Sequence, residues 1–273
     1  MLTLVPTPIG NLDDISLRSI EAFKGAEVLL CEDTRVTKRL LSLLTEKLDI
    51  HFPDYRFHPF HSHNETQFIK SLTPDFFDAA CLYVSDAGMP GISDPGLSLV
   101  RYCQDHGIPY DVLPGANAAL TSIVMSGFDT AHFSFYGFLP HKGKERQSAL
   151  SKALASGQPT IFYESPHRID KLIDELAQKY PDTMVFAIKE LTKMHQKYYK
   201  APAKELAEIF TGINKKGEWV VIVDSVAEGE HDPELLTMLK SLNAPKKDLA
   251  KIIAKVTGRP PKICYNELLD ENG

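Results

Sequence analysis

The chain has 273 residues, a formal net charge of −6, 43% hydrophobic residues and 24% charged residues. This composition is ordinary for a globular protein and excludes collagen-like, coiled-coil and wholly disordered classes. The net acidity also argues against a protein that coats nucleic acid nonspecifically. At about 150 residues per domain, the length predicts two domains.

The sequence contains no signal for export or membrane insertion. No apolar run reaches the roughly 20 residues of a membrane-spanning helix, and the opening residues MLTLVPTPIGNLDD lack the features of a signal peptide. We therefore expect a cytoplasmic protein. Its cysteines are far apart and form no CxxC pair, which predicts reduced, buried thiols at Cys31, Cys81, Cys103 and Cys264.

Apolar runs alternate with helical spacing, which is typical of an α/β fold. In the first part of the chain we expect strands at 2–5, 28–31, 81–84 and 110–113, and helices at 16–23, 36–48 and through Cys103. Three of these strands stop in loops of small or polar residues, at 6–11, 32–35 and 85–96. Ligands of open α/β sheets bind beyond the carboxyl ends of strands, so these loops mark the functional edge.

The pattern changes after residue 115, where we expect a domain boundary. A helix at 116–125 is followed by expected strands at 133–139, 160–163, 184–188 and 219–223. A charged linker at 228–233 leads to a pair of helices at 235–242 and 246–256. The sequence thus predicts α/β domains at 1–114 and 115–226 and a basic helical tail at 227–273.

Two loops bear on the kind of ligand. The turn PTPIGN holds one glycine, so it is not the GxGxxG of a Rossmann site, and the chain has no GxxxxGK[ST] loop for nucleoside triphosphates. The loop SDAGMPGISDPG places Asp86 and Asp94 after a strand, where they can meet a polar ligand. The alternative is a structural loop whose aspartates cap turns and the next helix.

Six motifs occur in the order PTPIGNLDDIS, CEDTR, FHSHNE, SDAGMPGISDPG, FYESPHR and ELTK. Together they resemble the tetrapyrrole-methylase superfamily over residues 2–226, and within it the RsmI type of ribosomal RNA 2′-O-ribose methyltransferases, which are class III methyltransferases. The resemblance implies two α/β domains with S-adenosylmethionine in the cleft between them, and usually a homodimer. The implied substrate is a cytidine ribose of 16S rRNA, at the decoding centre of the small ribosomal subunit.

The same resemblance implies, by position, a cofactor site made of Pro8, Ile9, Asp86, Met89, Asn117, Ala118, Tyr163, Leu191 and Val220. Asp86 is the expected anchor for the ribose or methionine part. The catalytic candidates are Asp33, Arg35, Glu190 and Lys193. Spacing does not choose a base or an assisting cation among these and the other motif residues, which are Glu32, His63, Asn64, Glu65, Glu164, His167 and Arg168. The chain departs from the family pattern at Met89, where threonine is common, at Asn117, and at Gln196, where a carboxylate is lost.

Basic residues concentrate in three segments, at 142–152, 189–204 and 240–262. These segments predict a positive face for a polyanion, or else solvated helix surface. The residues that we expect to contact RNA are His63, Asn64, Glu65, Arg168, Lys246, Lys247 and Lys251. We expect no metal site, because His61 and His63 have no obvious third ligand.

Two other functions fit parts of this pattern. A methyltransferase acting on a tetrapyrrole or precorrin carbon would share the fold and the cofactor, but the separate basic tail favours structured RNA. A ribosome-assembly factor that binds RNA without catalysis would keep the basic surfaces. Detection of bound S-adenosylmethionine would favour the enzymes over this last function.

Overall fold

The computed structural model describes residues 1–224, 233–242, 244–257 and 261–270. The chain forms two compact units. Unit 1 comprises Met1–Thr121 with Leu191–Met194, and unit 2 comprises Ser122–Glu190 with His195–Gly273. The domain boundaries at 114 and 226 stay predictions, and most of the expected linker at 228–233 lies outside the described residues.

Unit 1 is built on a parallel sheet, sheet 1, with strand order β3-β2-β4-β1-β5. The strands are β1 (Leu2–Leu4), β2 (Val28–Cys31), β3 (Arg56–Pro59), β4 (Cys81–Val84) and β5 (Tyr110–Val112). Every residue of β2 and β4 is buried. This explains their unbroken apolar runs, since a parallel sheet is covered on both faces.

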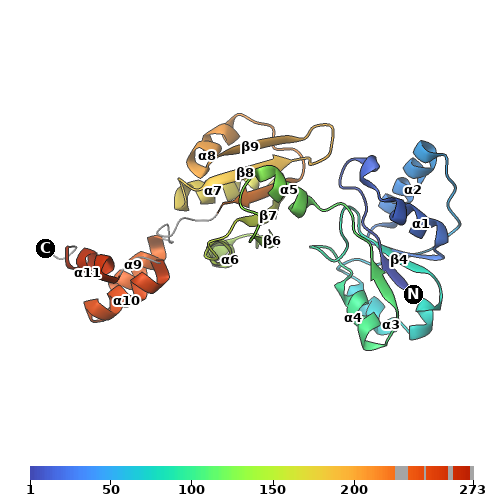
Figure 1. The fold of residues 1–273 in the computed structure, drawn as a ribbon, viewed down its shortest axis with the longest axis horizontal. Coiled ribbons are helices and arrows are strands. Elements are labelled where there is room, and N and C mark those ends of the chain that lie inside the picture. Colours follow the sequence, from blue (N-terminus) through green and yellow to red (C-terminus); the bar gives the residue numbers. More distant parts are fainter. Residues whose placement is uncertain (225–232, 243, 258–260, 271–273) are drawn as a thin grey trace. The chain divides into compact units, whose positions relative to one another are not determined.

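Helices cover both faces of sheet 1 (Figure 1). Phe23 and Leu41 pack with Leu29, Leu82 and Val84 on one face. On the other face, Leu99 and Cys103 pack with Leu30 and Tyr83, whose side chains alternate with those of the first face. The helices of unit 1 are α1 (Leu17–Gly25) and α2 (Thr34–Leu48) on the first face, and α3 (Glu65–Ser71) and α4 (Leu97–Asp105) on the second. α5 (Ala118–Ser126) runs from unit 1 into unit 2.

Unit 2 contains a mixed sheet, sheet 2, with strand order β6-β7-β10-β8-β9. β6 and β7 are parallel, whereas β10 runs antiparallel to β7 and β8, and β8 runs antiparallel to β9. The strands are β6 (Ser134–Phe138), β7 (Thr160–Glu164), β8 (Met184–Lys189), β9 (Lys197–Pro202) and β10 (Trp219–Val223). The carboxyl ends of β6, β7 and β8 therefore lie at the same edge as the start of β10.

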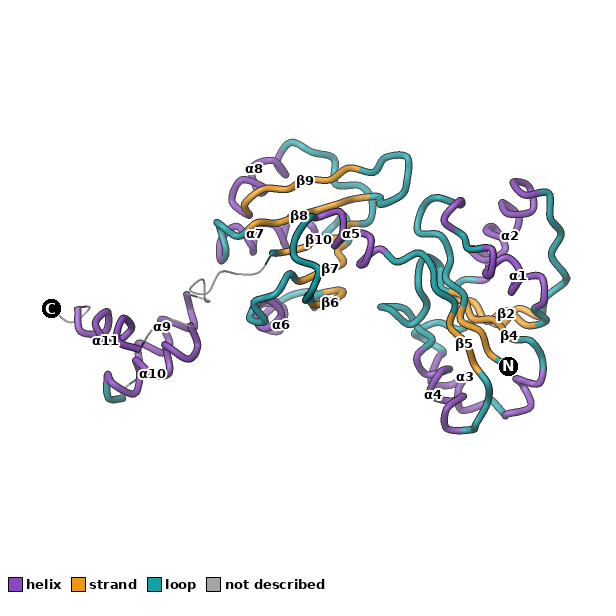
Figure 2. Tube along the Cα trace, in the orientation of Figure 1, coloured by secondary structure: helices purple, strands orange, loops and turns teal. Residues whose placement is uncertain are grey.

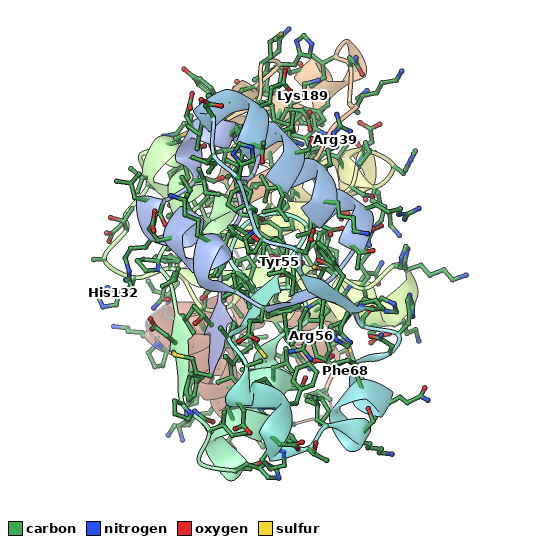
Figure 3. The ribbon with its side chains drawn as sticks, turned by 90° about the vertical axis from the view of Figure 1, so that its right-hand side faces the viewer. Arg39, Tyr55, Arg56, Phe68, His132 and Lys189 are labelled. Carbon is green, nitrogen blue, oxygen red and sulfur yellow. The ribbon has the colours of Figure 1, made fainter. Side chains whose placement is uncertain are left out.

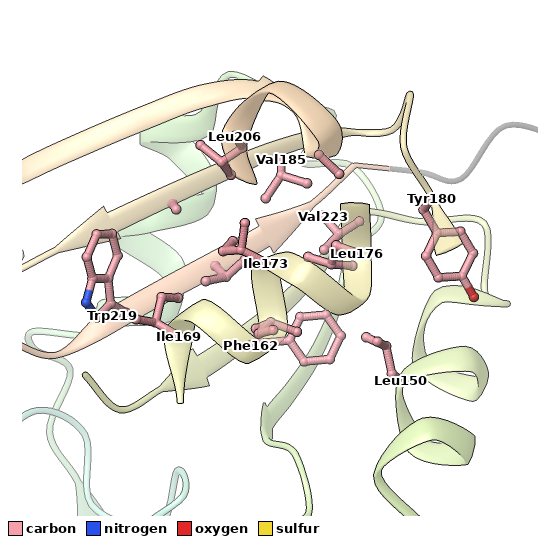
Figure 4. Packing of buried hydrophobic residues seen from close by; sticks show 14 of the residues in the cluster. Leu150, Phe162, Ile169, Ile173, Leu176, Tyr180, Val185, Leu206, Trp219 and Val223 are labelled. Carbon is pink, nitrogen blue, oxygen red and sulfur yellow. The ribbon is translucent and has the colours of Figure 1, made fainter. Parts of the chain in front are cut away.

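The core of unit 2 lies between sheet 2 and its helices (Figure 4). Leu150, Ile173 and Leu206 come from three helices and pack with Phe162 and Val223 of the sheet. These helices are α6 (Gly143–Leu154), α7 (Ile169–Lys179) and α8 (Ala203–Thr211).

The tail carries three described helices instead of the expected pair (Figure 2). They are α9 (Pro233–Ser241), α10 (Lys246–Thr257) and α11 (Pro261–Asp270). Leu249 and Ile253 of α10 pack with Cys264 and Leu268 of α11, so the tail has its own small hydrophobic core. The expected pair of helices ended at residue 256, and α11 begins at the second of two adjacent prolines, which interrupt the helical pattern.

The four cysteines are buried and unbonded, as predicted. Burial raises the pKa of the Cys31 thiol to about 11, which leaves this thiol protonated and unreactive at neutral pH. None of the described helices is both long enough and apolar enough to cross a lipid bilayer.

Candidate functional site

The loops after β1 and β4 are joined by two backbone hydrogen bonds. The Thr7 amide donates to the Gly88 carbonyl and the Gly88 amide donates to the Thr7 carbonyl, each over 3.0 Å. Gly88 has a φ of +84°, and a Cβ placed on it would lie 3.1 Å from Cγ2 of Ile9. A residue with a side chain is disfavoured there. The bridge brings Pro8 and Ile9 alongside Gly88 and Met89.

A chain of hydrogen bonds joins the loops after β2 and β4. The Asp33 amide donates to Oδ1 of Asp86 over 3.0 Å. The Asp86 amide donates to Oε2 of Glu32 over 3.1 Å. Burial and, after it, the charge of Glu32 raise the pKa of the Asp86 carboxyl. The charged form of Asp86 is therefore disfavoured, and a hydrogen-bond donor or a cation that approaches would stabilise it.

Asp33 and Arg35 form a bidentate pair at the start of α2. Nε of Arg35 lies 3.0 Å from Oδ1 of Asp33, and Nη2 lies 2.5 Å from Oδ2. The same carboxylate caps α2 by accepting from the Arg35 amide over 2.8 Å. These hydrogen bonds lower the pKa of Asp33 to about 2 and raise that of Arg35. Arg35 is nonetheless 89% exposed, so the pair presents a fixed cation to solvent.

The segment that starts α5 lies against the first turn. A Cβ on Gly115 would lie 2.6 Å from Cβ of Pro6, which requires glycine at that contact. Asn117 caps the helix, because its Oδ1 accepts from the Leu120 amide over 3.0 Å. Asn117 and Ala118 are thereby held beside the loop after β1.

Residues 191–194 join unit 1 although the chain on either side belongs to unit 2. The Asn11 amide donates to Oγ1 of Thr192 over 3.0 Å. A Cβ on Gly10 would lie 2.4 Å from Cγ of Lys193 and 2.9 Å from the Leu191 carbonyl oxygen. Leu191 and Lys193 therefore adjoin the turn that carries Pro8 and Ile9. Thr192 adopts a φ of +64°, an uncommon conformation that the contacts with Gly10 and Asn11 hold in place.

Most of the predicted cofactor and catalytic residues thus meet at one place, which we call the edge loops: residues 6–11, 32–35, 85–89, 115–118 and 191–194. All five segments lie in unit 1. The prediction overlooked Gly10 and Thr192 as individual residues. Their only signal was membership of the motifs PTPIGN and ELTK.

The remaining predicted residues of this group lie in unit 2. Tyr163 and Val220 are direct partners on adjacent antiparallel strands, so their side chains share one face of sheet 2. Glu190 adjoins the turn before β10: its Oε1 accepts from the Glu218 amide over 3.0 Å. Gly217, with a φ of +113°, leaves room for this glutamate side chain.

Arg168 belongs to a buried ionic cluster at the carboxyl ends of β6 and β7. Its Nη2 donates to the carbonyls of Leu139 and Pro140 over 2.6 and 3.2 Å. Its Nε lies 3.2 Å from Oε1 of Glu164. Arg146 is fully buried and contacts Glu164 at 3.4 Å and Glu175 at 2.8 Å.

The expectation that the basic segments are surface is therefore wrong in part. Arg146 lies in the first segment and is buried. Lys189 opens the second segment and is only 6% exposed. Its Nζ donates to the carbonyl of Asn214 over 2.6 Å. Each cation is buried because the fold supplies it with acceptors.

The loop after β3 carries the other predicted substrate residues. Asn64 holds this loop together: Oδ1 accepts from the His61 amide and Nδ2 donates to the Pro59 carbonyl, each over 2.8 Å. Glu65 accepts from Oγ of Ser98 over 2.5 Å. His63 is exposed, with its ring 5.9 Å from that of His61. In the described part of the chain no cluster of residues suits a metal ion.

The predicted basic residues of the tail lie on α10. Lys247 and Lys251 are exposed, and Nζ of Lys251 lies 3.5 Å from Oδ1 of Asp248. Lys246 is half-buried at the start of the helix. Arg259, in the same basic segment, lies outside the described residues.

Comparisons with known proteins agree on one family. The family model described as Tetrapyrrole (Corrin/Porphyrin) Methylases matches residues 1–207. The chain is 43% identical to a protein of Helicobacter pylori named ribosomal RNA small subunit methyltransferase I, with 99% of each chain covered. It is 43% identical to the protein of that name from Campylobacter fetus, covering 98% of this chain and 100% of the relative.

A solved structure shows the same fold. It is the uroporphyrin-III C-methyltransferase of Thermus thermophilus complexed with S-adenosylhomocysteine, with a TM-score of 0.57. The match covers 81% of this chain and 96% of the other, at 16% sequence identity.

Proposed function

The chain belongs to the tetrapyrrole methylase family, and on this premise we propose that it is an S-adenosylmethionine-dependent methyltransferase of small-subunit ribosomal RNA. The proposed reaction is methylation of the 2′-hydroxyl of a cytidine in 16S rRNA. The two relatives at 43% identity over the full chain support an rRNA substrate through their names. The cytidine and its ribose hydroxyl come from the motif resemblance.

The observation that carries this proposal is the convergence of the edge loops. Thr7 is bridged to Gly88, Asp33 to Asp86, and Asn11 to Thr192. These contacts gather loops from strands whose helices lie on opposite faces of sheet 1. Doubly wound sheets bind their ligands at such places.

The residues of the edge loops fit S-adenosylmethionine. Its ribose diol and ammonium group donate hydrogen bonds, and Asp86 offers a carboxylate held in place by its neighbours. Ile9, Met89 and Leu191 offer apolar surface for the adenine. We propose that Pro8, Asn117 and Ala118 also contact the cofactor, together with Tyr163 and Val220 of unit 2. When bound, the cofactor supplies an electrophilic methyl group on a sulfonium sulfur.

The chain's own residues then have to position the substrate hydroxyl. Positioning two reactants contributes about 7 to 11 kcal/mol to lowering a barrier. Asp33, with a pKa of about 2, is a poor proton acceptor, so we assign it to holding Arg35. Arg35 and Lys193 contact the phosphates or ribose beside the target. Glu190 positions the turn before β10 through its hydrogen bond with Glu218.

The rRNA is proposed to contact surfaces outside the edge loops as well. Lys246, Lys247 and Lys251 of α10 neutralise phosphates, and the exposed His63 contacts RNA near the edge loops. Asn64 and Arg168 are already engaged with the protein. We therefore propose that Asn64 and Arg168 support substrate binding indirectly. They hold their loops in place, so that neighbouring residues can contact the RNA.

The test is nucleoside mass spectrometry of 16S rRNA from a strain that lacks the gene. We expect loss of one 2′-O-methylcytidine, recovery with the wild-type chain, and no recovery with Asp86→Ala. An unchanged 2′-O-methylcytidine content would refute the proposed reaction. Normal recovery with Asp86→Ala would instead refute the assigned cofactor site.

The predictions of a homodimer and of a cytoplasmic location stay part of the proposal. Light scattering of the purified protein and cell fractionation test them. Purified protein that carries neither S-adenosylmethionine nor its demethylated product, and binds neither on titration, would favour the assembly-factor alternative. Methyl transfer to a tetrapyrrole but not to small subunits would favour the other alternative.

A further inference from the structure

A groove with a volume of about 670 Å³ opens in unit 1, lined by α3, α4 and the 85–96 loop. This volume lies within the roughly 300 to 1,000 Å³ of small-ligand sites. Its walls include Ser62, Glu65, Lys70, Ser93, Asp94 and Arg101. Of these residues, only Glu65 belongs to the substrate contacts predicted above.

The groove combines three kinds of polar group. Lys70 and Arg101 are exposed, and within the described residues neither forms an ion pair. Glu65 and Asp94 supply carboxylates, and serine and threonine hydroxyls also line the groove. An anion without hydrogen-bond donors would be repelled by both carboxylates and would bind weakly. A ribonucleotide suits the mixture, because its phosphate takes cations while its ribose hydroxyls and base amino groups donate to carboxylates.

The start of α4 adds a further anion-binding feature to the groove. Gly96 precedes the helix with a φ of +129°, and the Tyr83 ring would lie 2.6 Å from a Cβ at this position. The N-cap residue of α4 is this glycine, which supplies no capping side chain of its own. The first-turn residues Leu97 and Ser98 line the groove. Backbone amides at a helix start attract phosphate.

The two walls of the groove are fixed relative to each other. Oγ of Ser98 on α4 donates to Oε1 of Glu65 on α3 over 2.5 Å. Both helices also pack through Phe68, Ile69 and Leu99 onto the same face of sheet 1. Lys70 of α3 and Arg101 of α4 therefore line a preformed groove.

We propose that this groove binds a single-stranded ribonucleotide that flanks the methylated one in the rRNA. Its phosphate lies toward Lys70, Arg101 and the start of α4, and its sugar or base toward Glu65 and Asp94. The assignment rests on the proposed function and extends it. One loop connects the two sites, since Asp86 stands near its beginning and Asp94 near its end.

The test compares two double charge reversals with the same change in net charge. Lys70→Glu with Arg101→Glu alters the groove. Lys24→Glu with Arg39→Glu is the matched control, because these exposed cations lie on α1 and α2, which cover the opposite face of sheet 1 from α3. Figure 3 shows Arg39 well apart from Phe68 of α3.

The probe is a ten-nucleotide single-stranded RNA that carries 4-thiouridine and a fluorophore. We expect the groove variant to bind it at least tenfold more weakly than the control. The slope of log affinity against log salt should fall by about one or more. Cross-links in the wild-type protein should fall in residues 62–70 and 91–101. Titration with S-adenosylmethionine should give equal affinities for both variants, which shows that the groove variant is folded.

Equal RNA affinities for the groove variant and the control, or cross-links only outside these segments, would overturn the inference. This outcome is independent of activity. If the groove variant alone loses RNA binding but deletion of the gene leaves rRNA methylation unchanged, the groove stands and the proposed reaction fails.

Discussion

The Asp33 amide donates a hydrogen bond to the Asp86 carboxylate over 3.0 Å, and thereby ties the loops after β2 and β4 together. Asp86 in turn reaches Glu32 through its own amide. The two strands are neighbours in sheet 1. The contacts therefore place the carboxylates of Glu32, Asp33 and Asp86 close together. Together with burial, the repulsion raises the pKa of Asp86.

Asp86→Asn should stabilise the protein at pH 7 and weaken cofactor binding. Burial and Glu32 raise the pKa of Asp86 above its ordinary value of 3.8. A folded-state pKa above the unfolded one favours folding below the unfolded pKa, and this benefit is lost as the pH rises through the folded pKa. Asparagine removes the charge but keeps the oxygen that accepts from Asp33. The melting temperature should therefore rise at pH 7, and the gain should vanish near pH 3.

Isothermal titration should show a loss of S-adenosylmethionine affinity of roughly 10- to 100-fold for Asp86→Asn, the size of a hydrogen bond to a charged group. Asp54→Asn, at an exposed loop residue, is the control. A lower melting temperature for Asp86→Asn at pH 7 would contradict the role given to burial and Glu32.

Gly10→Ala should destabilise unit 1 by about 1 to 3 kcal/mol, because the added methyl group overfills its site. It would lie 2.9 Å from the Leu191 carbonyl, which cannot move as freely as the Lys193 side chain. Gly25→Ala is the control, since a Cβ there has nothing within 4 Å. Thermal unfolding measures the difference. Equal stability of the two variants would show that residues 191–194 adapt to the methyl group.

Arg146→Ala should destabilise the protein by about 3 to 5 kcal/mol, because the buried carboxylate of Glu164 loses one of its two cationic partners and keeps only Arg168. Adding Glu164→Gln should recover part of this loss. Arg18→Ala removes an exposed pair with Asp111 at 3.2 Å and should cost about 0 to 1 kcal/mol. Urea unfolding of the four proteins checks the order. A further loss on adding Glu164→Gln would sink the explanation.

Arg35→Ala and Lys193→Ala should reduce methyl transfer to small subunits while leaving S-adenosylmethionine affinity within about twofold. Both residues are proposed to position the RNA, an effect worth roughly 100-fold or more when reacting groups are displaced. A tritiated methyl assay and cofactor titration separate the two effects, with Arg39→Ala as control. Full activity in both variants would remove these residues from the site.

Replacing Lys246, Lys247 and Lys251 together by alanine should weaken binding to small ribosomal subunits and reduce its salt dependence. Three lost phosphate contacts lower the slope of log affinity against log salt by about 2 to 3. The control replaces Lys24, Arg39 and Lys47, which are exposed on α1 and α2. An identical slope in the two triple variants would exclude α10 from the RNA interface.

The sequence was most informative where strands are central. The expected strands at 81–84 and 219–223 have the same bounds as β4 and β10, because each is flanked on both sides and covered on both faces. β3 and β9 were missed. Both are edge strands with exposed polar residues, such as Arg56 and Lys197, so they lack an apolar run. The helices α3, α6, α7 and α8 were also not predicted.

The candidate site was likewise predictable only in part. That the loops after β1, β2 and β4 share an edge followed from parallel strands, and the contacts of Thr7 and Asp33 confirm this proximity. The burial of Arg146 did not follow from sequence. Its partner carboxylates are 18 and 29 residues away along the chain, and only the packed fold brings them to it.

The contact between Gly10 and residues 191–194 limits how the gene can be divided. A fragment ending at Thr121 would contain Gly10 but not residues 191–194, which pack against it. A half-length chain should therefore retain residues 191–194, for instance through a short linker or by circular permutation.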